Sequence, residues 1–375
     1  MSRALQLAAR GLYGTAPNPR VGCVVIRDGI VVGEGFHARA GEPHAEVHAL
    51  RAAGERARGA TVYVTLEPCS HHGRTGPCAD ALLAAGPARV VVAMQDPNPQ
   101  VSGRGIAKLR AAGIAVDVGL LESEARSLNE GFVARMTRGT PFVRVKLAMS
   151  IDGRTAMANG ESRWITGPEA REDVQKLRAR SGAVVTGIGT LLADDPALTV
   201  RAADWRYDDY ATGGTLPVRQ PLRVLLDRDL RASPSARLFA GDGPVLVVAE
   251  DRVLASAAGA ARAAALAARP GVEVMALPAG GNGGLALPAL LAELGRREVN
   301  ELLVEAGARL AGAFVAGGLA DELVVYAAPV LLGSTARPLL ELPLAAMADK
   351  QPLTLREVRQ LGADIRMTAR FPAAL

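Results

Sequence analysis

Segments with the character of β-strands alternate with helical segments along nearly all 375 residues, and this alternation restricts the chain to the α/β class. Two apolar runs within residues 21–36 are joined by Asp28-Gly29, a pair that predicts a β-hairpin. After the hairpin, helices and strands are expected in turn at residues 45–57, 61–66, 79–85, 89–94, 106–112 and 114–118. A hairpin followed by such alternation predicts a three-layer α/β/α sandwich.

A second alternating series begins after residues 136–141, which look like a short connector. Its strands are expected at residues 142–148, 183–188, 222–227, 244–249, 272–277 and 301–306, with a late pair near 322–331. Its helices are expected at 168–180, 251–268, 287–297 and 309–317, and the glycine-rich residues 279–284 at a surface loop. Because 375 residues exceed one typical domain, we predict two α/β domains, 1–140 and 141–375.

Metal-capable side chains are confined to a short part of the first domain. All five histidines and all three cysteines lie between residues 23 and 78. They are His37, His44, His48, His71, His72, Cys23, Cys69 and Cys78. A metal site with nitrogen and sulfur ligands must therefore lie in the first domain, and the second domain must work without imidazole or thiol. Three cysteines are too few for a disulfide scaffold, so a cytoplasmic protein is expected.

Four of the residues in this part have the order found in zinc-dependent deaminases of bases. His44 precedes a predicted helix, Cys69 follows a predicted strand, and Cys78 opens the next helix. One histidine and two cysteines leave the fourth zinc position open for water, whose pKa the metal lowers. Glu46 lies two residues past the histidine and can act as general acid and base. Eight residues separate the two cysteines instead of two, which suggests a substrate-specific loop.

The sequence also allows other interpretations of these residues. A purely structural zinc would use the same three ligands but would leave Glu46 unexplained. Asn18, in Pro17-Asn18-Pro19-Arg20, could present its amide to a base edge or belong to an ordinary turn. Cys23 is expected in the core, and His37, His71 and His72 at the surface or in loops.

In the second domain, two glycine-containing turns lead from a strand into a helix, at residues 186–190 and 305–309. Backbone amides at such turns can receive phosphate, although neither turn has the G-x-G-x-x-G pattern. Lys146 could polarise a sugar oxygen or hold a phosphate, or it could be a lysine on an edge strand that reaches solvent. Arg178 and Arg201 suit phosphate recognition, although most arginines face solvent.

The composition argues against nucleic-acid binding and against a membrane protein. The net charge of +5 is spread among acids and forms no basic run, and aromatic residues make up only 3%. The sequence has neither a secretory signal nor an apolar stretch of about 18 residues. A small phosphorylated substrate, with no nucleic acid or membrane as partner, fits this balance.

Both halves also resemble the bacterial bifunctional deaminase/reductase family of riboflavin biosynthesis. The first half carries PNPRVGC at 17–23, HAE at 44–46 and EPCSHHGRTGPC at 67–78. The second half carries VKLAMSIDGR at 145–154, SRWIT at 162–166, ADDPALTVR at 193–201 and EAG at 305–307. The motifs occur in the family's order over nearly the whole chain.

The resemblance implies a cytidine-deaminase-like first domain and a second domain similar in fold to dihydrofolate reductase. The first would use zinc to deaminate 2,5-diamino-6-ribosylamino-4(3H)-pyrimidinone 5′-phosphate. The second would use NADPH to reduce the ribosyl chain, giving 5-amino-6-(5-phosphoribitylamino)uracil. We also expect a homo-oligomer.

The resemblance further assigns residues to each site. Zinc would be held by His44, Cys69 and Cys78, with Glu46 and, in the reductase, Lys146 as catalytic groups. The nicotinamide cofactor would contact Ala148, Trp164, Thr190, Asp194 and the segment Gly307, Ala308, Arg309, Leu310, Ala311, Gly312 and Ala313. The substrates would contact Ser162, Arg178, Leu198, Arg201 and Glu305. Apart from the resemblance, the amide of Asn18 is also expected to contact a substrate.

Two other functions compete with this one. The chain could be a zinc deaminase of a nucleoside or tRNA base, fused to an unrelated nucleotide-binding α/β domain. It could also be a nucleotide-binding sensor that holds zinc only for stability.

Overall fold

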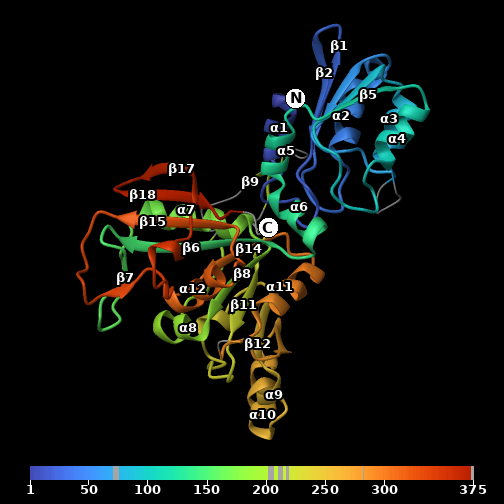
Figure 1. Cartoon of the computed structure of the whole chain (residues 1–375). Coiled ribbons are helices and arrows are strands. Elements are labelled where there is room, and N and C mark those ends of the chain that lie inside the picture. The colour runs from blue at the N-terminus through green and yellow to red at the C-terminus, as the bar shows by residue number, and fades with distance from the viewer. Residues whose placement is uncertain (71–75, 202–206, 210–213, 217–218, 282, 373–375) are drawn as a thin grey trace. The chain divides into compact units, whose positions relative to one another are not determined.

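The computed structural model describes residues 1–70, 76–201, 207–209, 214–216, 219–281 and 283–372. These residues form two compact units (Figure 1). The first consists of Met1–Thr140 with the described part of 204–218, which contains strands β9 (Tyr207–Asp209) and β10 (Gly214–Leu216). The second consists of the described residues of 141–203 and 219–375.

The first unit is built on a five-stranded sheet with the order β2-β1-β3-β4-β5. Its strands are β1 (Gly22–Arg27), β2 (Ile30–Phe36), β3 (Thr61–Val64), β4 (Arg89–Val92) and β5 (Ala115–Val118). Strands β3, β4 and β5 are parallel, whereas β1 is antiparallel to both of its neighbours. Asp28 and Gly29 join β1 to β2 with φ of 52° and 77°, the left-handed values that a tight hairpin turn needs.

Helices cover both faces of this sheet, as the three-layer prediction requires. Cys23 and Val25 of β1 pack into the core that contains α2, α3 and α4, while Val24 faces α1. The bounds are α1 (Ser2–Ala9), α2 (Ala45–Ala53), α3 (Cys78–Ala85), α4 (Arg104–Ala111), α5 (Glu122–Leu128) and α6 (Glu130–Arg138), with a 3₁₀ turn at Gly54–Ala57. Cys23 is fully buried, so the prediction of a core cysteine is confirmed.

The second unit contains a nine-stranded sheet with the order β13-β12-β11-β8-β14-β6-β15-β18-β17. Its strands are β6 (Phe142–Ser150), β8 (Ala183–Gly187), β11 (Leu222–Leu226), β12 (Val245–Glu250), β13 (Val272–Leu277), β14 (Glu301–Glu305), β15 (Glu322–Ala328), β17 (Thr354–Leu361) and β18 (Asp364–Arg370). The first seven are parallel, and β18 and β17 extend the sheet in antiparallel fashion. A separate pair joins β7 (Arg154–Ala156) to β16 (Arg337–Pro338).

The two faces of this sheet have separate apolar cores. One core holds Val143, Val145 and Leu147 of β6 with helices α11 and α12. The other lies under α7 and α10 and takes in Val324 and Tyr326 of β15. The helices are α7 (Pro168–Arg180), α8 (Ile188–Asp194), α9 (Asp251–Leu254), α10 (Ala257–Ala267), α11 (Leu287–Arg296) and α12 (Ala308–Ala316), with 3₁₀ turns at Arg237–Phe239 and Met347–Asp349. None of the helices in the described parts of either unit is long and apolar enough to cross a membrane.

Three predictions about individual elements were wrong. Helix α6 continues to Arg138, so the connector is shorter than the predicted 136–141. The single helix expected at 251–268 is two helices, because the Ser256 side chain accepts a bond from the Gly259 amide and caps a new helix. The late strand pair expected near 322–331 is one strand, β15, and the antiparallel pair is β17 with β18.

Candidate active sites in the two units

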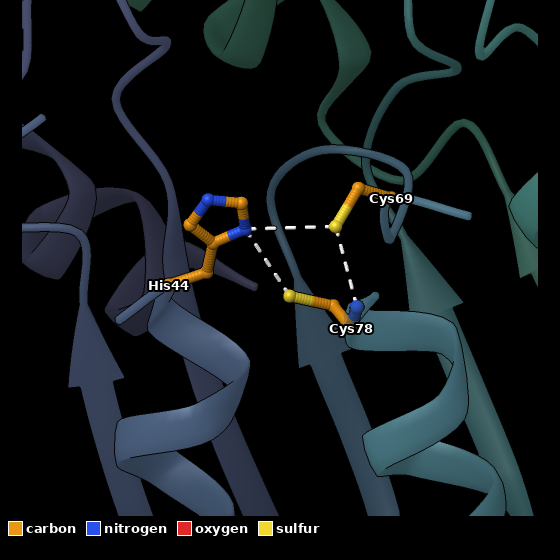
Figure 2. Close-up of side chains that lie close together, drawn as sticks. All are labelled: His44, Cys69 and Cys78. Atoms are coloured by element: carbon orange, nitrogen blue, oxygen red, sulfur yellow. Dashed lines mark hydrogen bonds between the residues drawn. The ribbon is translucent and has the colours of Figure 1, made fainter. Parts of the chain in front are cut away.

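Three side chains of the first unit converge on one point, as Figure 2 shows. His44 precedes α2, Cys69 follows β3, and Cys78 is the first residue of α3. The His44 Nδ1 atom lies 3.2 Å from the Cys78 Sγ and 3.6 Å from the Cys69 Sγ. All three candidate ligand atoms lie within 4.8 Å of one another. The structure therefore brings together the histidine and the two cysteines that the sequence singled out.

The 3.6 Å separation of His44 Nδ1 and Cys69 Sγ matches a tetrahedral zinc site, and the 3.2 Å separation of His44 Nδ1 and Cys78 Sγ is somewhat shorter. Zinc binds histidine nitrogen at about 2.0–2.1 Å and cysteine sulfur at about 2.3 Å, so tetrahedral ligands lie about 3.5–3.8 Å apart. The Cys69 sulfur accepts the Cys78 backbone N–H at 3.2 Å. Hydrogen bonds from Cys78, and from His44, lower the pKa of Cys69, which favours the thiolate, the form that binds metal.

Glu46 lies beside this group, in the first turn of α2. Its side chain is buried, and its carboxyl group interacts with the Cys78 side chain. Burial raises the pKa of Glu46 to about 7. A carboxyl group with a pKa near neutrality can both accept and return a proton, which a general acid and base must do.

His37 connects Asn18 to the same region. It lies in a loop, one of its two predicted positions, but it is buried and not at the surface. Its Nδ1 atom lies 3.2 Å from the Pro43 carbonyl oxygen, and its Nε2 atom lies 3.1 Å from the Asn18 Nδ2. A carbonyl can only accept, so Nδ1 carries the hydrogen and Nε2 accepts from the Asn18 amide. Burial lowers the pKa of His37 to about 4, which keeps the ring neutral.

Glu67 has contacts that the sequence reasoning missed. Its buried carboxylate accepts hydrogen bonds from the backbone N–H groups of Asp96, Gly103, Gly105 and Ile106, at 2.9 to 3.2 Å. These groups lie at the start of α4 and in the segment before it. A glutamate next to a proline and a cysteine gives no local signal of such distant partners.

In the second unit, Lys146, Arg178 and Glu305 form a charged cluster. Arg178 binds both carboxylate oxygens of Glu305, at 2.5 and 2.9 Å, and the Lys146 Nζ lies 4.0 Å from the same carboxylate. Burial alone would raise the pKa of Glu305, but Arg178 and Lys146 together lower it. Strand β6 lies between β14 and β15, so Lys146 is not on an edge strand and that reading was wrong.

Both glycine turns lead from a strand into a helix, as predicted. The first joins β8 to α8, and the second joins β14 to α12 with Gly307 as the N-cap. The Gly307 N–H donates to the Thr190 hydroxyl at 3.3 Å, so the two turns are neighbours. The Ala311 N–H already donates to the Gly307 carbonyl, and Gly312 and Ala313 follow inside the helix. Their amides are used by the helix, which leaves those before Ala311 to receive a ligand.

The remaining predicted residues lie in several places of the second unit. Ser162 donates to the Asp194 carboxylate at 3.3 Å. The Trp164 ring is largely exposed and packs against the guanidinium of Arg171, 4.7 Å from the ring centre. Leu198 is buried, and Arg201 is exposed, while Ala148 lies on β6. His71 and His72, in the loop between the cysteines, lie outside the described residues.

Comparison with known families assigns both units. Residues 1–94 match the cytidine and deoxycytidylate deaminase zinc-binding region, and residues 141–367 match the RibD C-terminal domain. The second match disfavours a base deaminase fused to an unrelated domain.

Relatives match over nearly their whole length. The riboflavin biosynthesis protein RibD of Escherichia coli is 52% identical over 97% of this chain and 96% of its own. The solved structure of Acinetobacter baumannii RibD is 46% identical, with a TM-score of 0.87 over 99% of this chain and 97% of that one.

A Thermotoga maritima structure named as a diaminohydroxyphosphoribosylaminopyrimidine deaminase/5-amino-6-(5-phosphoribosylamino)uracil reductase is also similar. It is 33% identical, with a TM-score of 0.83 over 99% of this chain and 97% of that one. The zinc-ligand geometry, both domain matches and the full-length likeness agree. The chain therefore belongs to the RibD family, whose members join a zinc-dependent deaminase to an NADPH-dependent reductase in riboflavin biosynthesis.

Proposed function

We propose that His44, Cys69 and Cys78 hold the zinc ion of the deaminase and that Glu46 moves its protons. The enzyme removes the 2-amino group of 2,5-diamino-6-ribosylamino-4(3H)-pyrimidinone 5′-phosphate and then reduces the ribosyl chain of the product. The convergence of three ligand atoms within 4.8 Å of one another, next to a buried carboxyl group, carries the proposal. When bound, zinc supplies a Lewis acid that lowers the pKa of a coordinated water toward 7.

Glu46 performs both proton transfers of the hydrolysis. It accepts a proton from water as the water oxygen bonds to C2 of the pyrimidine. It then passes a proton to the amino group, so that the carbon–nitrogen bond breaks and ammonia leaves. A pKa raised to about 7 by burial supports this role, because neither proton transfer is then strongly uphill near neutral pH.

Asn18 recognises the pyrimidine edge in this proposal. Its Nδ2 group donates to His37, which leaves the Asn18 carbonyl oxygen to accept from an N–H of the substrate. His37 cannot reverse this arrangement, because its other nitrogen must donate to the Pro43 carbonyl. Asn18 therefore selects a hydrogen-bond donor on the ring.

In the second unit, we propose that NADPH lies across the ends of β6, β8 and β14. The paired turns around Thr190 and Gly307 suit its phosphates, because the first amides of α12 point out of the helix end. Ala148, Trp164 and Asp194 complete the cofactor contacts. When bound, NADPH supplies the hydride for the ribosyl carbon.

The substrate of the reductase would contact Ser162, Arg178, Leu198, Arg201 and Glu305. Lys146 would polarise the sugar oxygen that gains a proton during reduction. Its neighbours support this role, because burial lowers the pKa of Lys146 while Glu305 opposes that effect and holds the ammonium in place. The Arg178–Glu305 pair fixes a guanidinium beside the same lysine.

We further infer that residues 1–140 form the deaminase domain and residues 141–375 the reductase domain. The division of the main chain between Thr140 and Pro141 supports this boundary, whereas the described part of 204–218 groups with the first unit and departs from it. The three cysteines are free, and a zinc–thiolate site needs them reduced, which favours a cytoplasmic location. We also infer a homo-oligomer that binds small phosphorylated pyrimidines and not nucleic acid, which light scattering and an RNA-binding titration would test.

One incubation series tests the proposed function. The enzyme is given the diaminopyrimidine ribotide first without and then with NADPH, and ammonia release and NADPH oxidation are followed. We expect ammonia release without NADPH, and NADPH oxidation only once deaminated product is present. NADPH oxidation with no ammonia release, or no turnover with zinc bound, would contradict the proposal.

A further inference from the structure

We infer that Glu67 is a positioning residue that holds the zinc ligand Cys69 in place and thereby sets the zinc affinity of the deaminase. Glu67 lies two residues before Cys69 and is not within the group of ligand atoms. The inference rests on the proposed role of Cys69 as a zinc ligand. It adds a residue that is not itself one of the candidate zinc ligands.

The carboxylate of Glu67 is fully engaged by backbone N–H groups. One oxygen, Oε1, accepts from Gly105 at 2.9 Å and from Ile106 at 3.2 Å. The other, Oε2, accepts from Gly103 at 2.9 Å and from Asp96 at 3.1 Å. A negative charge at a helix N-terminus is stabilised by the helix dipole and by the N–H groups that have no partner within the helix. Glu67 thus caps the N-terminus of α4 from a distant part of the sequence, because the N-cap residue, Gly103, makes no side-chain capping bond.

The next residue, Pro68, is held by the same helical turn. A Cβ atom on Gly105 would lie only 2.0 Å from the Pro68 carbonyl oxygen, so only glycine allows this close approach. The helix is anchored in turn by Ile106 and Leu109, which are buried in the first unit. The two residues before Cys69 are therefore fixed to one turn of α4, and the start of the Cys69 backbone is fixed with them.

A ligand held in place before the metal binds loses less conformational freedom on binding, so the metal binds more tightly. Replacement of residues that orient metal ligands typically weakens metal affinity about 10–100-fold. Glu67 fits this class, because its four bonds join the turn before Cys69 to α4 and to the segment before α4. We expect zinc affinity to depend on this carboxylate although it never reaches the metal.

The test is Glu67→Gln in the full-length enzyme. Glutamine has the same shape, but its NH2 group would face two N–H donors where a carboxylate oxygen now accepts from both. We expect the zinc Kd, measured by competition with a chromogenic chelator, to rise about 10–100-fold. We also expect an altered visible spectrum when cobalt(II) replaces zinc, because that spectrum reports the coordination geometry. Deaminase kcat should recover at saturating zinc, since Glu67 takes no part in the chemistry.

Asn129→Asp is the matched control. Asn129 is also buried in the first unit, where its amide accepts from the Arg20 N–H at 2.8 Å and donates to the Arg20 carbonyl at 2.9 Å. This substitution also exchanges an amide and a carboxyl group, and it removes a buried hydrogen bond to the Arg20 carbonyl. Asn129 does not contact the segment Glu67–Pro68 that precedes Cys69 through any of these hydrogen bonds. The substitution should lower thermal stability and leave the zinc Kd within about threefold of the wild-type value. Reductase turnover in each variant reports that the second unit is folded.

Gly105→Ala keeps the inference testable if Glu67→Gln does not fold. This variant keeps the Glu67 carboxylate, but its added methyl group would clash with the Pro68 carbonyl oxygen. A raised zinc Kd would therefore support the inference independently of Glu67→Gln. A folded Glu67→Gln enzyme with wild-type zinc Kd and cobalt spectrum would overturn it, as would an equal loss of affinity in Asn129→Asp. Cys69→Ser distinguishes failure of the proposed zinc site from failure of the inference about Glu67. Full zinc affinity in that variant would show that Cys69 is not a zinc ligand.

Discussion

Both sites contain a buried glutamate, and the pKa values of the two are shifted in opposite directions. Glu46 lies beside the zinc ligands, where burial raises its pKa to about 7. Glu305 is held as a carboxylate by Arg178 and Lys146, which together lower its pKa. The proposed roles of the two glutamates therefore differ, a proton carrier in one unit and a fixed anion in the other, because their neighbours differ.

Glu46→Gln should lower deaminase kcat by about 10²–10⁴-fold, because the amide cannot carry a proton from water to the departing amine. Zinc content should stay at the wild-type level, since Glu46 is not a ligand. Ammonia release measures the activity, and atomic absorption measures the metal. Glu42→Gln is the control, because Glu42 is not among the candidate ligands and forms an ion pair with partly exposed Arg39. Full deaminase turnover in Glu46→Gln would refute the acid–base role.

Glu305→Gln should change the acid stability of the second unit in a defined direction. A carboxyl group whose pKa is lowered by folding stabilises the protein above its unfolded pKa, about 4.3, and loses this contribution as pH falls through the folded value. The wild type should therefore be more stable than Glu305→Gln at pH 7, and this difference should shrink below about pH 4. Thermal unfolding at several pH values measures it. A difference that grows with acidification would contradict the assignment.

At the scale of elements, strand β6 carries charge on a buried face. Arg144 and Lys146 alternate with Val143, Val145 and Leu147, so one face of the strand is apolar and the other is polar. The Arg144 guanidinium pairs with Glu301 of β14 at 3.1 Å and with Glu322 of β15. One buried side chain thus joins three neighbouring strands of the parallel sheet.

Arg144→Met should lower the free energy of unfolding of the second unit by about 3 kcal/mol. Two buried carboxylates each lose a partner, although Glu301 keeps Arg180 and Glu322 keeps Arg370. The chain offers a matched control in Arg89→Met. Arg89 of β4 also pairs with a neighbouring strand, at 2.6 Å to Asp117 of β5, but both side chains are about half exposed. That loss should be below about 1 kcal/mol. Denaturant unfolding measures the free energy of unfolding of both variants. Equal losses would contradict the prediction that a buried ion pair contributes more than an exposed one.

At the scale of the whole molecule, the two chemistries are confined to separate units. All histidines and cysteines lie between residues 23 and 78, within the first unit. The candidate residues of the reductase all lie in the second unit. Metal chemistry and hydride transfer should therefore be separable in the intact enzyme.

Removal of zinc with a chelator should abolish ammonia release and leave NADPH oxidation with the deaminated product within about twofold of the untreated rate. The reason is that the second unit has no histidine or cysteine with which to bind zinc. Added zinc should restore the first activity. A parallel loss of both activities would mean that the reductase also depends on the metal.

Much of the fold and of the zinc site was decided by local pattern. The Asp28-Gly29 pair produced the β1–β2 turn, and helix α7 begins and ends at the predicted residues. The ligand order of His44, Cys69 and Cys78 also predicted their convergence, because one histidine and two cysteines in this order are typical of a zinc site. Periodicity and residue type are properties of short segments, so a sequence displays them directly.

Only the tertiary structure decided the contacts between distant segments. Glu67 finds its partners 29 to 39 residues away, and Arg178 meets Glu305 across 127 residues. The ring of His37 is buried, and both of its nitrogens form hydrogen bonds there, with Asn18 and with the Pro43 carbonyl. The residues next to His37 in the sequence gave no sign of these partners. Such pairings depend on how strands and helices pack, and no local pattern encodes that packing. The sequence by itself therefore predicted the candidate zinc ligands and the order of the elements, whereas only the folded chain shows which distant charged groups meet.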